Sequence, residues 1–134
     1  MSIYAFDLDG TLDVPAIARL ARDLYAAGHK IHVVTGWLDP ICKDIELVRQ
    51  SKTQKLEALG VPYHEMHLVR APVRDFSIVA KAKAEILKKI EAGLFIDDMI
   101  EFAQASFSVG VSSLCVYPPT RSLPYYCPHC SKAS

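Results

Sequence analysis

The chain has 134 residues, of which 51% are hydrophobic, and its 15 lysines and arginines balance its 15 aspartates and glutamates. A length of this order favours one domain around a single core. The balanced charge gives no support for a bulk attraction to nucleic acid or to membranes. No stretch approaches the roughly 20 consecutive apolar residues of a membrane-spanning helix, and residues 1–20 lack the pattern of a secretory signal. We therefore expect a cytoplasmic protein that does not bind membranes.

Short apolar segments alternate with longer amphipathic ones along the chain. In order, we expect a strand over residues 3–6, a helix over 14–27, a strand over 31–35, a helix from 39 up to Gly60 with a break in the polar stretch 49–55, a strand over 63–69, a helix from 75 up to Gly93, a strand over 94–96, a short helix over 100–107 and a strand over 114–117. Asp13, Asp39 and Asp75 are expected to be helix N-caps. This alternation predicts an α/β fold of the doubly wound, Rossmann-like kind, with a mainly parallel five-stranded sheet between two layers of helices.

Polar residues follow three of the expected strands. They are Asp7 and Asp9 after the first, Thr35 and Gly36 after the second, and Asp97 and Asp98 after the fourth. In open α/β sheets, ligands bind beyond the carboxyl ends of the strands, so these side chains should converge. Two carboxylates about 4 Å apart repel by roughly 4 kcal/mol at an effective dielectric of 20, so clustered acids need protons or cations between them. Because Mg²⁺ prefers carboxylate and phosphate oxygens, the pattern predicts a metal-assisted phosphoryl site.

The same positions carry a family resemblance. "DLDGT" at 7–11, Thr35 with Gly36, a lysine in the helix before the fourth strand, and "FIDD" at 95–98 resemble the four motifs of the haloacid dehalogenase-like (HAD) superfamily. The match keeps their order and spans residues 3–117. The resemblance implies the strand order 3-2-1-4-5 and a phosphatase, because dehalogenases of the superfamily lack the second aspartate, here Asp9. Little chain is left for a cap domain, so the resemblance is to the capless type, whose site is open.

The resemblance implies roles in the chemistry for four of these residues. Asp7 would be the nucleophile that forms an aspartyl-phosphate, and its carboxylate needs no base to activate it. Asp9 would protonate the leaving oxygen and later deprotonate the attacking water. Thr35 and the backbone amide of Gly36 would bind phosphoryl oxygens.

The resemblance also implies a metal site and a phosphate-site lysine. Asp7, Asp97, Asp98 and the backbone carbonyl of Asp9 would hold Mg²⁺. Which of Asp97 and Asp98 touches the ion directly stays open. Lys83 would place positive charge beside the transferring phosphoryl group. Lys81 is the alternative, because two lysines two residues apart on a helix project about 200° apart and only one can reach the site.

An open site is closed either by a large substrate or by another subunit. The expected partner is therefore a phosphorylated substrate such as a nucleotide, a nucleic-acid end or another large molecule, and assembly into a homo-oligomer stays open. Five basic residues could form a rim for a polyanion or be ordinary solvated charges: Arg49, Lys52, Lys55, Arg70 and Arg74.

The C-terminal tail carries a separate signal. We expect the catalytic domain over residues 1–119 and a tail over 120–134, in which Cys-Pro-His-Cys at 127–130 has the spacing of half a zinc site. Zinc held within one chain, zinc shared between subunits, and a pair of reactive or unremarkable thiols all stay open. The alternative function is a non-catalytic phosphate-binding or scaffold module of the same fold that acts through this tail.

Overall fold

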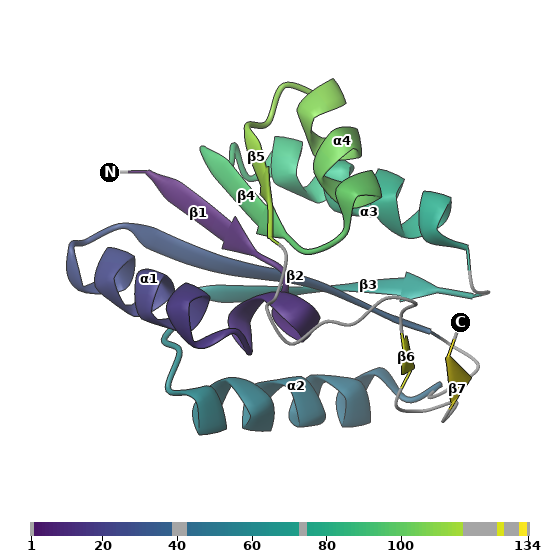
Figure 1. The fold of residues 1–134 in the computed structure, drawn as a ribbon, viewed down its shortest axis with the longest axis horizontal. Helices are drawn as coiled ribbons and strands as arrows, with labels where there is room; N and C mark the ends of the chain where they lie inside the picture. Colours follow the sequence, from purple (N-terminus) through teal and green to yellow (C-terminus); the bar gives the residue numbers. More distant parts are fainter. Residues whose placement is uncertain (1, 39–42, 73–74, 117–125, 128–131, 134) are drawn as a thin grey trace.

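The computed structural model describes residues 2–38, 43–72, 75–116, 126–127 and 132–133. Its centre is an all-parallel sheet of five strands in the order β3-β2-β1-β4-β5 (Figure 1). The strands are β1 (Ile3–Phe6), β2 (Lys30–Leu38), β3 (Glu65–Ala71), β4 (Leu94–Asp97) and β5 (Ser113–Cys115). The helices are α1 (Pro15–Ala26), α2 (Ile45–Leu59), α3 (Phe76–Lys89) and α4 (Ile100–Ser108), and the turn η1 covers Leu8–Leu12. The α/β class and the strand order are confirmed.

The helices cover both faces of the sheet, with α1 and α2 on one side and α3 and α4 on the other (Figure 1). Successive strand residues point to opposite faces, so neighbours enter different cores. Ala5 and Phe95 pack in the core beneath α3 and α4, whereas Phe6 and Ile96 pack in the core beneath α1 and α2. All four side chains are fully or almost fully buried. Burial on both faces explains why β1 is apolar throughout and why β4 is apolar up to its last residue, Asp97.

The second helix differs from the one expected. Helix α2 runs without a break from Ile45 to Leu59, and its N-cap is Asp44, whose carboxylate accepts hydrogen bonds from the backbone amides of Glu46 and Leu47. The predicted break at 49–55 is therefore wrong. Two lysines of this polar stretch, Lys52 and Lys55, donate hydrogen bonds to Asp9 of the turn η1. The predicted start at Asp39 lies outside the described residues.

The expected N-caps have different outcomes. Asp75 does cap α3, since its carboxylate accepts from the backbone amide of Ser77 at 2.9 Å. Asp13 does not cap α1, whose N-cap is Val14 with Pro15 in the first turn. The carboxylate of Asp13 accepts from a lysine of α2 instead. Asp39 again falls outside the described part of the chain.

The tail is described only in part. Strand β6 (Tyr126–Cys127) pairs antiparallel with β7 (Lys132–Ala133). The predicted domain boundary at 119/120 and residues 128–130 of the Cys-Pro-His-Cys motif lie outside the described residues. The domain division and the role of the motif therefore remain predictions.

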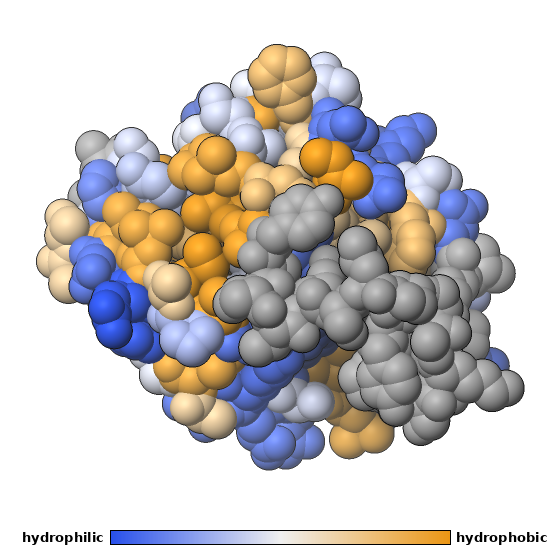
Figure 2. All heavy atoms as spheres, in the orientation of Figure 1, coloured by the Kyte–Doolittle hydropathy of each residue, from blue (hydrophilic) through white to orange (hydrophobic). Residues whose placement is uncertain are grey.

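The surface mixes apolar and hydrophilic residues. On the face seen in Figure 2, apolar residues gather beside hydrophilic ones over the region where α1 and β5 lie in Figure 1. The exposed large apolar residues include Leu20 and Tyr25 of α1 and Leu114 of β5. Scattered exposed apolar side chains are normal for folded proteins. Within the described parts of the chain, none of the helices combines the length and apolar character that a membrane span requires.

Candidate active site

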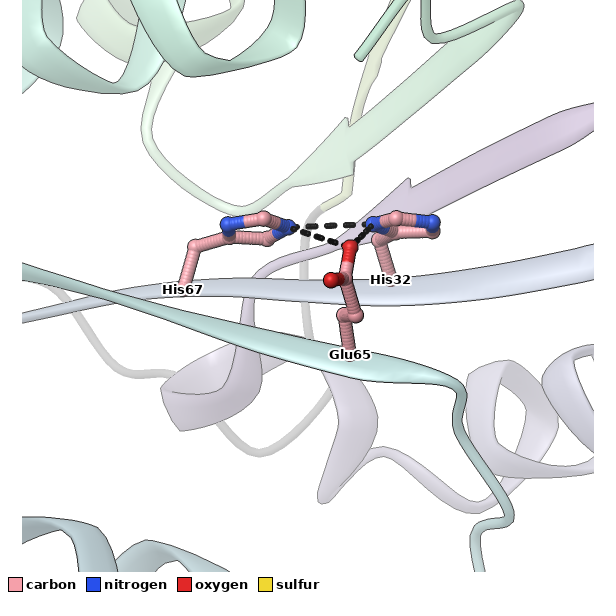
Figure 3. Close-up of side chains that lie close together, drawn as sticks. All are labelled: His32, Glu65 and His67. Atoms are coloured by element: carbon pink, nitrogen blue, oxygen red, sulfur yellow. Dashed lines mark hydrogen bonds and ion pairs between the residues drawn. The ribbon is translucent and has the colours of Figure 1, made fainter.

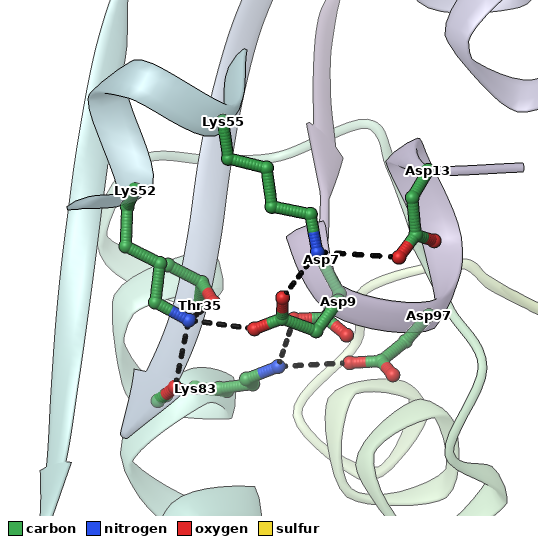
Figure 4. A network of polar contacts seen from close by, with 9 residues as sticks. Asp7, Asp9, Asp13, Thr35, Lys52, Lys55, Lys83 and Asp97 are labelled. Carbon is green, nitrogen blue, oxygen red and sulfur yellow. Dashed lines mark hydrogen bonds and ion pairs between the residues drawn. The ribbon is translucent and has the colours of Figure 1, made fainter. Parts of the chain in front are cut away.

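Three buried carboxylates meet where β1 and β4 end. Asp7 directly follows β1, Asp97 is the last residue of β4, and Asp98 follows it. Their side chains each offer an oxygen that lies within 4.8 Å of the others. Lys83 reaches them from α3 and donates to Asp7 Oδ1 and Asp97 Oδ2, both at 3.0 Å (Figure 4). Lys83 is 1% exposed, and this one buried ammonium group contacts two of the three carboxylates.

Gly10 and Thr11, in the turn after β1, lie against the side chain of Asp98. Gly10 has a φ of 79°, and a Cβ atom there would lie 2.3 Å from Asp98 Oδ2, so another residue would be strained and would clash. Thr11 Oγ1 is 3.5 Å from Asp98 Oδ1, at the long end of hydrogen-bond distances. The backbone amide of Asp7 donates to the carbonyl of Ile96 at 3.0 Å. The turn therefore holds Asp7 and Asp98 against each other across β1 and β4.

Burial sets the protonation behaviour of this cluster. Burial raises the pKa of Asp7 to about 6, with Lys83 opposing the rise and Asp97 adding to it. Burial also raises the pKa of Asp97, again against the effect of Lys83. Burial opposes the charge on Lys83, but Asp7 and Asp97 outweigh it and raise its pKa. The Lys83 ammonium also lies 4.6 Å from the ring centroid of Phe102, within cation–π range.

The donor set fits a hard divalent cation. Three buried carboxylates against one lysine leave excess negative charge in a desolvated site, and the oxygens are close enough for one ion to contact all of them. Mg²⁺ takes oxygen ligands and usually keeps positions for water and phosphate oxygens. Asp7, Asp97 and Asp98 are therefore the residues that could hold Mg²⁺, whereas the carboxylate of Asp9 is turned elsewhere.

Asp9 is held by two lysines of α2 (Figure 4). Lys52 Nζ lies 2.6 Å from Asp9 Oδ2 and 3.1 Å from Thr35 Oγ1, and Lys55 Nζ lies 2.6 Å from Asp9 Oδ1 and 3.2 Å from Asp13. Burial would raise the pKa of Asp9, but Lys52 and Lys55 outweigh it and lower the pKa to about 2. In this arrangement the Asp9 carboxylate is ionised at neutral pH.

A small cavity joins the two groups of charges. It has a volume of about 150 Å³ and is lined by Asp7, Asp9, Thr35, Gly36, Trp37, Phe76, Val79, Lys83 and Phe102. A larger hollow of about 520 Å³ lies between α3 and α4, but none of the buried charged residues lines it. The chemistry therefore points to the smaller cavity as the candidate active site.

The structure brings the expected site residues together, with two differences of position. Thr35 is not at the end of a strand, because β3 pairs with β2 as far as Leu38 while β1 pairs with it only as far as Val33. Beyond Val33, β2 no longer pairs with β1, and Thr35 borders the cavity there. Asp9 lies in the turn η1 and not on an extended strand, so it points to α2 and not to the three buried carboxylates.

Lys81 and Lys83 differ in burial and in contacts. Lys83 contacts Asp7 and Asp97 inside the protein, whereas Lys81 is exposed and borders the larger hollow.

The two lysines on Asp9 were not identified as site residues from the sequence. Lys52 and Lys55 are three apart on a helix and so share a face, which is the signal that could have separated them from the other basic residues. Arg49 pairs with Glu46 on the helix surface, and Arg70 is exposed. Arg74 lies outside the described residues. Of the expected basic rim, Lys52 and Lys55 contact Asp9, which lines the cavity.

Comparisons with known proteins show the fold. No protein-family model and no curated protein matches the chain. A structure of the Pnkp1/Rnl/Hen1 RNA repair complex matches with a TM-score of 0.60 and 16% identity over 86% of this chain and 42% of that one. A universal stress protein in complex with cAMP matches with a TM-score of 0.55 and 16% identity over 87% of this chain and 97% of that one. The D,D-heptose 1,7-bisphosphate phosphatase from Burkholderia thailandensis matches with a TM-score of 0.51 and 16% identity over 83% and 75% of the two chains.

The three solved structures that match come from proteins with different functions. The chain spans less than half the length of the chain that it matches in the RNA repair complex. At 16% identity the comparisons establish the α/β architecture and leave the activity to be argued from the site itself.

Proposed function

We propose that this chain is a Mg²⁺-dependent phosphatase of the HAD type, which hydrolyses a phosphate monoester through an aspartyl-phosphate on Asp7. The observation that supports this best is the meeting of Asp7, Asp97 and Asp98 with Lys83 beside a cavity that Thr35 borders. A phosphatase is among the solved structures of the same fold. The metal and phosphate-site residues implied by the sequence resemblance are thus near one another in space.

The proposed reaction has two displacement steps. In the first, a carboxylate oxygen of Asp7 attacks phosphorus, the bond to the substrate oxygen breaks, and that oxygen takes a proton from Asp9. In the second, water attacks the phosphorus of the aspartyl-phosphate, passes a proton to Asp9 and releases Asp7 with inorganic phosphate. Lys83 offsets charge on Asp7, and Thr35 with the Gly36 amide holds phosphoryl oxygens. When bound by Asp7, Asp97 and Asp98, Mg²⁺ would neutralise charge on the phosphoryl group.

The lysines of α2 connect substrate binding to the protonation of Asp9. An acid with a pKa of about 2 holds almost no proton at neutral pH, so Asp9 cannot serve as the acid while both lysines hold it. A phosphoryl group in the cavity competes for Lys52, which already lies 3.1 Å from Thr35 Oγ1. Transfer of Lys52 from Asp9 to the phosphoryl group raises the pKa of Asp9 when the substrate is in place.

Replacing Lys52 by methionine is expected to raise the pKa of Asp9 above its value of about 2. A carboxyl group with a lowered pKa stabilises the fold above its unfolded value of 3.8 and loses that contribution as the pH falls towards 2, so acid unfolding should be less steep in the variant. A carbon-detected NMR titration of the Asp9 side chain measures the shift. Arg49→Met, on the same helix but paired with Glu46, is the control. An Asp9 titration that is the same in the wild type and in Lys52→Met would contradict the role given to Lys52.

The size of the cavity limits what enters it. At about 150 Å³ it is smaller than the roughly 300–1,000 Å³ of pockets that enclose a whole small-molecule ligand. It has room for the phosphoryl end of a substrate, with the remainder outside. Only residues 72–75 join β3 to α3, and Asp13 and Val14 join η1 to α1, which leaves little chain for a cap at either place. These features support an open site that acts on a nucleotide, a nucleic-acid end or another large phosphorylated molecule.

Release of phosphate from a small aryl phosphate tests the proposed activity. We expect release in Mg²⁺, loss of release in EDTA and recovery when Mg²⁺ is returned. Asp98→Asn should raise the Mg²⁺ concentration needed for half-maximal rate, because it removes one of the three clustered carboxylates. Asp44→Asn, in the exposed N-cap of α2, is the control. Nucleotides and 3′-phosphorylated RNA are the next substrates to test, since a chain of an RNA repair complex has the same fold.

The alternative is a non-catalytic phosphate-binding or scaffold module that acts through the tail 120–134. It would bind inorganic phosphate but would release none from any substrate in Mg²⁺ above the background of an Asp7→Asn variant.

A further inference from the structure

A second group of metal-binding side chains lies apart from the candidate active site. His32 comes from β2, and Glu65 and His67 come from β3 (Figure 3). His32 Nδ1 lies 3.0 Å from His67 Nε2 and 3.5 Å from Glu65 Oε2, and His67 Nε2 lies 3.7 Å from the same carboxylate oxygen. The proposed phosphatase reaction uses none of these three residues.

The pairing of β2 with β3 builds this group. His32 is opposite Glu65 in the register of the two strands, and His67 is two residues further along β3, so it points to the same face of the sheet as Glu65. His32 and Val34 are two residues apart on β2 and therefore point to the same face of the sheet. Val34 packs in the core beneath α3, so α3 covers that face. Thr35 comes three positions after His32 along β2, a distance of about 10 Å. The group is therefore near the amino ends of the strands, whereas the candidate active site is near their carboxyl ends.

The three separations match those between ligands of a tetrahedral zinc ion. Zinc binds imidazole nitrogen at about 2.0–2.1 Å and carboxylate oxygen at about 2.0–2.2 Å, so two such ligands of one tetrahedral ion lie roughly 3.3–3.5 Å apart. The observed separations of 3.0, 3.5 and 3.7 Å are centred on that value. Small rotations of the side chains would allow all three atoms to contact a single ion.

Hydrogen bonding satisfies the group incompletely. If both imidazoles are neutral, a single N–H between His32 Nδ1 and His67 Nε2 joins the two rings, and Glu65 Oε2, at 3.5 Å and 3.7 Å from these nitrogens, is beyond the usual hydrogen-bond distance from either. A cation bound between the three atoms would give the carboxylate a partner. Burial lowers the pKa of His32, with His67 also lowering it and Glu65 opposing, and burial lowers that of His67, with Lys89 nearby. Neutral imidazole is the form that binds metals.

We propose that His32, Glu65 and His67 form a binding site for a divalent transition metal, with Zn²⁺ as the ion that the geometry fits best. Two imidazoles and one carboxylate are ligands that Zn²⁺ accepts. The side chain of His32 is 8% exposed but that of Glu65 is 63% exposed, so water can reach the fourth position from the side of Glu65. Because the ligands come from β2 and β3, the ion would join the edge strand β3 to the rest of the sheet.

Zinc titration of the full chain with Cys127→Ser and Cys130→Ser tests this site without the thiols of the tail. Excess Mg²⁺ in the buffer competes with Zn²⁺ for the carboxylate cluster of Asp7, Asp97 and Asp98. We expect one tightly bound Zn²⁺, measured in competition with a chelating dye, and a rise in melting temperature on binding, because an ion that binds only the folded state stabilises it. Zinc should also shift the imidazole NMR signals of His32 and His67.

Glu65 and His67 are more exposed than His32, so substitutions at these two residues test zinc binding with little effect on folding. His67→Asn and Glu65→Gln should each weaken Zn²⁺ binding by about a hundredfold or more, since even residues that only support metal ligands are worth about 10–100-fold. His29→Asn, at a half-buried histidine beside the ring of Tyr4 and outside the group, should bind Zn²⁺ as tightly as the parent. The proposal is overturned if the parent takes up no Zn²⁺, or if His67→Asn binds it as well as the parent does. Neither outcome bears on the phosphatase proposal.

Discussion

Asp7→Asn is expected to lower phosphate release by at least about a thousandfold and, in the absence of Mg²⁺, to raise the stability of the fold. The loss of activity follows because the amide cannot form the covalent intermediate, and loss of a nucleophile costs at least this much in enzymes that depend on one. The gain in stability follows from burial. The Asp7 side chain is 9% exposed and shares its site with Asp97 and Asp98, so a neutral amide relieves both desolvation and repulsion.

The pH dependence of this effect has a definite sign. The pKa of Asp7 is about 6 in the folded protein against 3.8 in the unfolded chain. Between these values the unfolded chain loses its proton first as the pH rises, so the wild type loses stability over that window. At 1.36 kcal/mol for each pKa unit, the loss is roughly 3 kcal/mol, with the opposing effect of Lys83 already included in the pKa of Asp7. The asparagine variant lacks this titration, and the stability difference should therefore be largest above pH 6.

Urea unfolding in EDTA at several pH values measures the stability, and an aryl phosphate assay measures the activity. Asp23→Asn, an exposed aspartate on α1, should change neither. An Asp7→Asn protein that is less stable than the wild type in EDTA at pH 7 would show that the carboxylate contributes favourable contacts that outweigh its burial. Residual Mg²⁺-dependent turnover near the wild-type rate would exclude Asp7 as the nucleophile.

The carboxylate cluster could be predicted because its residues are attached to strands whose pattern is strong. An apolar run that ends in an acid determines both the strand and the place of the acid, and this holds for Asp7 after β1 and for Asp97 at the end of β4. The parallel order of the strands then brings the two acids together. The family resemblance favours Lys83 over Lys81, and Lys83 is among the buried residues of α3.

Other features depend on contacts that no local pattern encodes. The polar stretch 49–55 suggested a break in α2, but Lys52 and Lys55 find Asp9 and Asp13 across the molecule, and the helix continues. Those contacts also make Asp9 an anion held by lysines, which its place in the motif does not reveal.

The group of His32, Glu65 and His67 was missed for a similar reason. Glu65 and His67 have the two-residue spacing of one strand face, but only the register of β3 against β2 shows that His32 joins them.

Lys83→Met is expected to destabilise the Mg²⁺-free protein by about 3–5 kcal/mol, the usual cost of removing one partner from a buried charged group. Lys83 is 1% exposed and donates to both Asp7 and Asp97, so its loss leaves those carboxylates without their ammonium. Lys81→Met is the matched control, because it makes the same change two residues earlier on an exposed side of α3 and should cost within about 0.5 kcal/mol. Urea unfolding in EDTA measures both.

The double variant Lys83→Met with Asp7→Asn separates charge from packing. If the cost of Lys83→Met comes from uncompensated carboxylates, removing the Asp7 charge should recover part of it, with a coupling of roughly 0.5–3 kcal/mol between the two substitutions. Mg²⁺ should likewise restore stability to Lys83→Met, because a cation near Asp7, Asp97 and Asp98 replaces the lost positive charge. Additive effects in the double variant, together with no response to Mg²⁺, would mean that Lys83 contributes by its packed hydrocarbon chain alone. The carboxylates would then not act as the single charged unit on which the proposed reaction depends.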